Sequence, residues 1–114
     1  MTTLEKARKI AKLLDDKKGK DITILDITAA TSVGDYFVIA SATSAPQINA
    51  LVDEVEDKMA QDGVKVLHKE GARTATWVLM DFGDVIVHVF HEETREFYGI
   101  ERLWSDAPKI EFEV

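Results

Sequence analysis

The segment WVLMDFGDVIVHVF, residues 77–90, constrains the fold more than any other part of the chain. It predicts two apolar strands joined by a tight turn at DFGD. A two-residue turn at Phe82 and Gly83 would place Trp77 opposite His88. Because side chains alternate between the two faces of a strand, both faces of this hairpin are apolar. Such a hairpin needs cover on both sides.

The two faces differ in composition. One carries only aliphatic side chains: Val78, Met80, Val85, Val87 and Val89. The other, here called the mixed face, carries aromatic, aliphatic and polar side chains: Trp77, Leu79, Asp81, Asp84, Ile86, His88 and Phe90. An open face of this kind would be an interaction site. The alternative is that Trp77 and Phe90 are ordinary core, since large aromatic side chains are more often buried.

Helices and strands elsewhere follow from periodicity and capping signals. Thr2 and Glu5 have the spacing of a capping box, and a helix is predicted over residues 3–16. A second helix begins near Ser44 and ends before Gly63. Strands are predicted over residues 21–27, 36–43, 64–71, 77–80 and 85–90. Each helix has one apolar stripe, so if both cover the aliphatic face, the mixed face stays open or is only partly covered by the C-terminal segment.

These elements predict an α/β (α+β) fold with a mixed five-stranded sheet and two main helices. The step from the strand at residue 36 to the strand ending near residue 70 is expected to be a parallel crossover. Residues 1–108 are expected to form a single domain. Residues 109–114 are expected to form a loosely ordered tail. The sequence HEETREFYGIERLW, residues 91–104, predicts neither a helix nor a strand.

Composition narrows the class of protein. The 114 residues carry a net charge of −7, which disfavours binding to a phosphate backbone and suits a basic partner or simple solubility. The chain has no cysteine, so disulfides and thiolate metal sites are excluded. It has no apolar run of the roughly 20 residues that span a bilayer and no secretory signal. These features favour a cytoplasmic protein.

A complete active site is not predicted. His88 and His91 would point to opposite faces of a continuing strand, so they do not predict a metal site. Asp81 and Asp84 could bind Mg²⁺ for phosphoryl transfer, although aspartate is also a common turn former. The chain has no glycine-rich phosphate loop to accompany them.

The motifs of the second half, taken in order, resemble one known family. WVLMDFGDVIVHVF, REFYGIERLW and DAP follow one another, with DYFVIASATS and HKEG before them. Together they resemble the ribosomal silencing factor, or Iojap, family over about residues 4–108. The combination of D-x-G-D-V-I-V-H-V with F-Y-x-I-E-x-L-W is the specific part of the resemblance.

The resemblance implies a non-enzymatic protein without cofactors. Such proteins bind the large ribosomal subunit through ribosomal protein L-fourteen, block joining with the small subunit, and lower translation when nutrients are scarce. The fold would be similar to that of nucleotidyltransferases without their catalytic motif. Expected partners are the large subunit and a second copy of the chain in a homodimer, with no free nucleic acid and no membrane.

On this basis the mixed face and its edge are expected to bind the partner, with acidic side chains meeting basic ones. The expected residues are Trp77, Leu79, Asp81, Asp84, Ile86, His88, Phe90, Glu92, Tyr98, Glu101 and Trp104. The sequence between Ala42 and Gln47 departs from the glycine-containing loop of the family, which leaves the role of this loop open. Two other hypotheses are a minimal nucleotide-binding or nucleotidyltransferase domain using Asp81 and Asp84, and a generic dimerisation domain.

Overall fold

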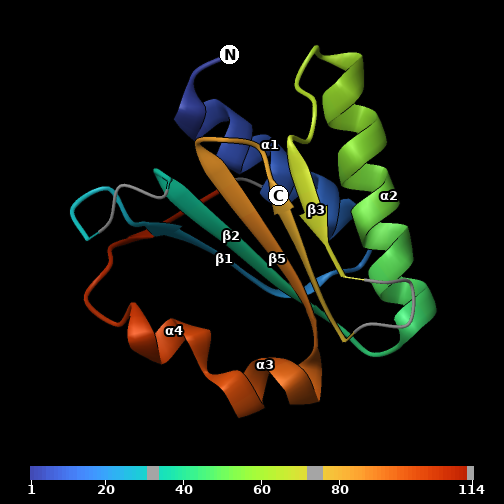
Figure 1. Cartoon of the computed structure of the whole chain (residues 1–114), viewed down its shortest axis with the longest axis vertical. Helices are drawn as coiled ribbons and strands as arrows, with labels where there is room; N and C mark the ends of the chain where they lie inside the picture. Colours follow the sequence, from blue (N-terminus) through green and yellow to red (C-terminus); the bar gives the residue numbers. More distant parts are fainter. Residues whose placement is uncertain (31–33, 72–75, 113–114) are drawn as a thin grey trace.

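The structure, a computed structural model, describes residues 1–30, 34–71 and 76–112. Its helices are α1 (Thr3–Asp16), α2 (Ala45–Gln61), α3 (Glu92–Tyr98) and α4 (Ile100–Leu103) (Figure 1). Its strands are β1 (Lys20–Asp26), β2 (Tyr36–Ala42), β3 (His68–Glu70), β4 (Trp77–Asp81), β5 (Val85–His91) and β6 (Lys109–Ile110). Among these helices, none is long and apolar enough to cross a membrane.

Within the described residues the strands form one mixed sheet in the order β3-β4-β5-β2-β1-β6. β2 and β5 are parallel, and the other neighbouring strands are antiparallel. These pairings make β3 run in the same direction as β2, as the predicted crossover requires, but β4 and β5 lie between them. The mixed α/β class is confirmed.

In the described part of the chain the sheet has six strands, one more than the five predicted. β6 pairs with β1 through Ile110 opposite Ile24, so Lys109 and Ile110 are not part of a loose tail. Ile110 and Phe112 also pack against the core beneath α1 and α2. The alternation of apolar and charged residues from Lys109 to Phe112 is a strand pattern, although two residues are too few to predict a strand from it.

Local sequence explains how both long helices begin. In α1, Thr2 Oγ1 accepts a hydrogen bond from Glu5 N at 3.1 Å and Glu5 Oε1 accepts one from Thr2 N at 2.8 Å, which confirms the capping box. In α2, Ser44 Oγ accepts from Gln47 N at 3.2 Å. Gln47 Nε2 also donates to the Lys18 carbonyl at 3.0 Å. The loop between Ala42 and Gln47 therefore ties the start of α2 to the end of α1.

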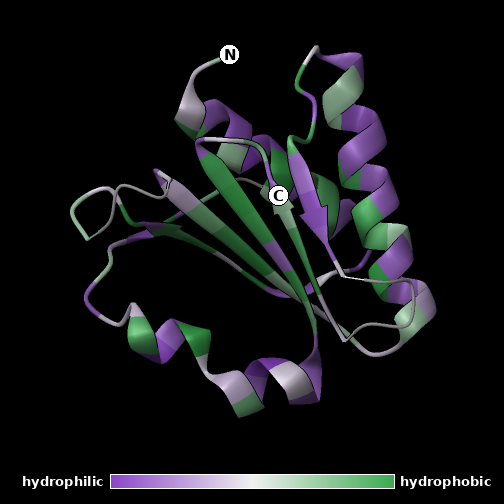
Figure 2. Ribbon diagram, in the orientation of Figure 1, coloured by the Kyte–Doolittle hydropathy of each residue, from purple (hydrophilic) through white to green (hydrophobic). Residues whose placement is uncertain are grey.

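α1 and α2 cover the aliphatic face of the hairpin, which is the arrangement that the sequence analysis considered. Their buried stripes are Ala7, Ile10, Ala11 and Leu14 in α1, and Ile48, Leu51, Val52, Val55 and Met59 in α2. These residues form one core with Val78, Met80, Val85, Val87 and Val89. Figure 2 shows that the central strands are strongly hydrophobic, whereas the outward side of α2 is largely hydrophilic.

The predicted hairpin register is wrong by two residues. Trp77 lies opposite Phe90, not opposite His88, and His88 lies opposite Leu79. The cause is the position of the turn, which is formed by Gly83 and Asp84, with Gly83 at φ 95°. Positive φ at the first turn residue favours glycine. Because the shift is an even number, every side chain remains on its predicted face.

Gly99 joins α3 to α4 in the left-handed conformation, with φ 55°. We expect Gly99→Ala to lower the free energy of unfolding by about 1 kcal/mol, since a Cβ disfavours positive φ. Gly99→Asn should cost less, because asparagine tolerates this region better than alanine. Urea denaturation of the three proteins measures both effects. Equal stability of the alanine variant and the parent would contradict this account of the helix junction.

Candidate partner-binding surface

The mixed face is covered rather than open or only partly covered, and Phe90 is core, as the alternative interpretation held. α3 and α4 lie on the side of the sheet away from α1 and α2 (Figure 1). They close a second core formed by Leu25, Ile27, Phe37, Ile39, Ile86, Phe90 and Ile100. Ile86, His88 and Phe90 are at most 4% exposed and therefore cannot contact a partner directly. The reason is that residues 91–104 fold into two short helices, which bury Arg95 and Ile100 and place Trp104 against the second core.

Other predicted residues remain accessible at the edge of this second core. Trp77 and Leu79 are half-buried on β4. The Trp77 ring is stacked on Phe90 with centroids 4.9 Å apart, and its centroid lies 5.2 Å from that of Tyr98. Tyr98 is 55% exposed and Phe97 beside it is 79% exposed. We call Trp77, Leu79, Phe97 and Tyr98 the aromatic surface.

α4 adds one exposed apolar side chain, Leu103, and is followed by Trp104. Leu103 is 79% exposed, whereas Trp104 is half-buried with its ring 5.2 Å from that of Phe37, edge to face. Sequence reasoning named Trp104 but neither Phe97 nor Leu103 as a binding residue. Phe97 and Tyr98 are two adjacent aromatic residues within an otherwise acidic segment, and this pattern could have indicated that Phe97 is an exposed binding residue.

His88 has a structural partner within the chain. The Trp77 indole Nε1 donates a hydrogen bond to His88 Nδ1 at 3.1 Å. A neutral imidazole that accepts at Nδ1 carries its proton on Nε2. In the described part of the chain, that Nε2 is buried without a hydrogen-bond partner. Burial lowers the pKa of His88 to about 4, so the ring is neutral at neutral pH.

Arg95 is the structural residue that sequence reasoning missed. It is 9% exposed, and its guanidinium contacts three other elements. Nε donates to Glu101 Oε1 at 2.8 Å, Nη1 to Ser41 Oγ at 2.8 Å, and Nη2 to Thr23 Oγ1 at 3.4 Å. The available signal was Ser41, a polar residue at an inward position of β2 that needs a buried polar partner.

All four predicted acidic contact residues make contacts within the chain, and that of Asp81 lies in the turn. The hydrogen bond from Arg95 lowers the pKa of Glu101, which therefore stays ionised in this ion pair. Asp84 accepts from Lys6 Nζ at 2.9 Å and from Thr3 Oγ1 at 2.9 Å. Although burial by itself raises the pKa of Asp84, the hydrogen bonds from Lys6 and Thr3 hold it below its ordinary value. The remaining acid, Glu92 on α3, is exposed and lies 3.8 Å from Lys20 Nζ.

The turn aspartates do not form a metal centre with each other. Asp81 Oδ1 accepts from Gly83 N at 2.7 Å, which makes it a turn residue. Asp84 is paired with Lys6, whose Nζ lies 2.9 Å from Asp84 Oδ2. Across residues 1–30, 34–71 and 76–112, no group of three or more metal-ligating side chains is arranged to hold an ion.

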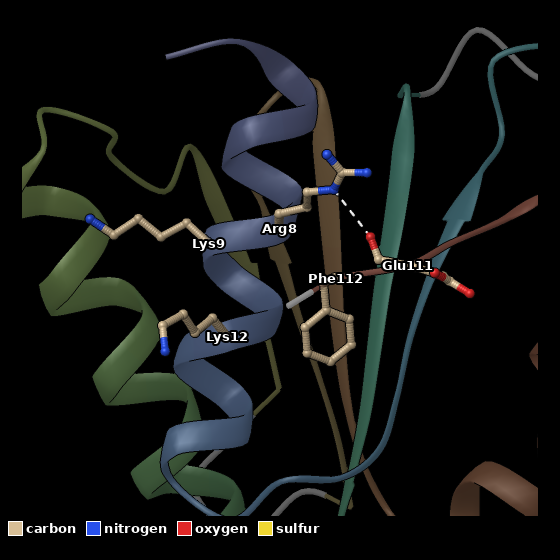
Figure 3. Close-up of a pocket in the computed structure, with 5 residues that line it drawn as sticks. All are labelled: Arg8, Lys9, Lys12, Glu111 and Phe112. Atoms are coloured by element: carbon tan, nitrogen blue, oxygen red, sulfur yellow. Dashed lines mark hydrogen bonds between the residues drawn. The ribbon is translucent and has the colours of Figure 1, made fainter. Parts of the chain in front are cut away.

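A hollow of about 670 Å³ lies on the other side of the molecule, between α1 and the C-terminal segment (Figure 3). It is lined by Arg8, Lys9, Lys12, Glu111 and Phe112. Arg8 Nε donates to the Glu111 carbonyl at 3.1 Å. Lys9 pairs with Asp62, and Lys12 Nζ lies 3.7 Å from Asp16. Both lysines of this hollow are therefore paired with aspartates.

Comparison with solved structures defines the structural class first. A crystal structure of a protein from Chromobacterium violaceum matches the whole chain with a TM-score of 0.89 and 38% identity, and the match covers 94% of that chain. The architecture described above is therefore that of a group of proteins with known structures.

Sequence comparison then identifies the family. A family model described as "Ribosomal silencing factor during starvation" matches residues 1–114. Ribosomal silencing factor RsfS of Bacillus subtilis is 45% identical over 82% of this chain and 80% of its own. The chloroplastic protein Iojap of Arabidopsis thaliana is 34% identical over 92% of this chain and 44% of its own. The chain belongs to the ribosomal silencing factor family, which confirms the resemblance seen in its motifs.

Proposed function

We propose that this protein represses translation by binding the large ribosomal subunit through ribosomal protein L-fourteen. Bound there, it would prevent joining with the small subunit when nutrients are scarce. Membership of the family supports the ribosome as the target, and the exposed aromatic surface is the single structural observation that supports a protein partner. The Phe97 side chain is 79% exposed and its ring lies 5.2 Å from that of Tyr98, which lies 5.2 Å from that of Trp77. Aromatic side chains are enriched in protein interfaces, and tryptophan and tyrosine are among the residues that dominate binding energy.

Charge supports a basic partner for this surface. α3 carries Glu92, Glu93 and Glu96, all exposed beside Phe97. Ribosomal proteins are commonly basic, and complementary charge at the rim of an interface speeds association and fixes orientation. The molecule measures 33 × 33 × 27 Å, so a copy seated on the joining face would keep the two subunits apart sterically.

The proposed contact residues differ from those predicted from sequence. Trp77, Leu79, Tyr98 and Glu92 stay in the binding set, and Phe97 and Leu103 join it. Ile86, His88 and Phe90 support the surface from beneath. We further propose that the protein acts in the cytoplasm without catalysis or a cofactor. A homodimer formed through the aromatic surface would compete with the ribosome, so dilution would raise the fraction of the protein that is free to bind.

Co-sedimentation with separated ribosomal subunits tests this function. We expect binding to the large subunit and not to the small one. Phe97→Ala should weaken binding by about 2 kcal/mol, or roughly 30-fold, because it removes an exposed anchor. Trp77→Ala should weaken binding at least as much, since it also loosens Tyr98.

Leu67→Ala is the matched control, because Leu67 is also a large apolar side chain and is 73% exposed, near the turn residue Gly83. It should bind like the parent. Loss of binding in Leu67→Ala with full binding in Phe97→Ala would refute the proposed surface, and equal sedimentation with both subunits would refute the function.

A further inference from the structure

We infer that Arg95 is a positioning residue that sets how α3 and α4 sit on the sheet and thereby holds the aromatic surface in its binding geometry. The inference for binding rests on the proposed function. The inference for helix placement does not, since it follows from contacts within the chain.

Arg95 is the only buried residue of α3. α3 has seven residues and α4 has four, of which Ile100 is the buried one. Helices this short are marginal without tertiary contacts. α1 and α2 are held on the sheet by their apolar stripes. α3 buries no apolar side chain fully, so its attachment depends on the polar contacts of Arg95.

The contacts of Arg95 fix the orientation of α3 on the sheet as well as its distance from it. The guanidinium is a rigid planar fork, so hydrogen bonds from three of its nitrogens define its orientation. One of them reaches β2 at Ser41, another β1 at Thr23, and the last α4 at Glu101. Arg95 therefore joins both helices to two strands, on either side of the helix junction at Gly99.

The arrangement of the aromatic surface depends on the position of α3. Phe97 and Tyr98 lie two and three residues after Arg95 in the same helix. Tyr98 must also stay beside Trp77, which belongs to β4 and does not move with α3. A change in the position of α3 would separate Tyr98 from Trp77 and divide the surface in two.

The test compares Arg95→Lys with Val55→Ala. Lysine keeps the positive charge but cannot make three directed contacts. Val55 is fully buried in α2 on the opposite side of the sheet, so its truncation lowers stability without touching α3. Affinity for isolated large subunits should fall roughly tenfold or more in Arg95→Lys and stay within about twofold of the parent in Val55→Ala. A loss of affinity that tracks stability equally in both variants would overturn the inference.

A measurement without ribosomes separates this inference from the proposed function. Trp77→Phe leaves Trp104 as the only tryptophan, because the chain has two. Quenching of Trp104 fluorescence by acrylamide then reports whether α4 is seated. We expect Arg95→Lys to raise the quenching constant about twofold and Val55→Ala to leave it unchanged. Ser41→Ala removes one contact of Arg95 from the strand side and should also raise the quenching constant. It replaces Arg95→Lys in this experiment if that variant does not fold.

The outcomes are distinct. Increased quenching in Arg95→Lys or Ser41→Ala supports the positioning role, even if the parent fails to bind large subunits and the proposed function is thereby refuted. Unchanged quenching in both variants would refute the positioning role, whatever the ribosome experiment shows.

Discussion

Phe90→Ala is expected to lower the free energy of unfolding by about 4 kcal/mol, the cost of removing a fully buried phenylalanine from a packed core. Phe90 has no exposed surface and lies in the second core beneath α3 and α4. Its ring is stacked against Trp77, with centroids 4.9 Å apart, and against His88 at 5.9 Å. Truncation would leave a cavity and remove the support of the aromatic surface.

Urea denaturation measures this loss, with Phe97→Ala as the control. Phe97 is 79% exposed, so its truncation should change stability by no more than about 0.5 kcal/mol. The two variants remove the same side chain and differ only in burial. A loss below about 1 kcal/mol for Phe90→Ala would mean that the mixed face is open, contrary to the fold described here.

The second large effect is a pH dependence from His88. Its pKa is about 4 in the folded protein, because burial disfavours the charged ring. The unfolded chain takes up this proton near the ordinary value of about 6.5. Between these values the unfolded state binds more protons than the folded state, so stability falls as pH is lowered from about 6.5 to about 4. The loss should be about 2 kcal/mol at pH 5 and about 3 kcal/mol at pH 4.

His88→Phe separates this contribution from that of the carboxylates. Glu101 and Asp84 have lowered pKa values, so the stability that they contribute is lost only below the ordinary carboxylate range, under about pH 4.5. Urea denaturation at several pH values between 7.5 and 5 should show a falling stability in the parent and a flatter profile in His88→Phe. Parallel profiles for the two proteins would contradict a buried neutral His88.

Features with a strong local signal were predictable from sequence. The capping box of α1 and the stripe of α2 depend on residues three or four positions apart. The faces of the hairpin were correct even though its register was not, because side-chain direction repeats every two residues. The turn at Gly83 and Asp84 could equally have started one residue earlier, and pattern alone does not decide between them.

Features that depend on distant partners were not predictable. α3 and α4 are too short to show a periodic stripe, so the sequence indicated at most partial cover of the mixed face by the C-terminal segment. Arg95 is separated by 54 residues from Ser41 and by 72 from Thr23, and its role appears only when the chain is folded. The same holds for Asp84 and Glu101, whose ionised side chains read as surface charges in sequence but form ion pairs within the molecule.

The most direct test of the central claim is side-chain footprinting of the protein bound to isolated large ribosomal subunits. The account predicts that Phe97, Tyr98 and Leu103 lose solvent accessibility on binding. Phe112, beside α1 on the other side of the sheet, should keep its accessibility. Protection of Phe112 with no change at Phe97 and Tyr98 would contradict the claim that α3, α4 and the edge of β4 form the binding surface.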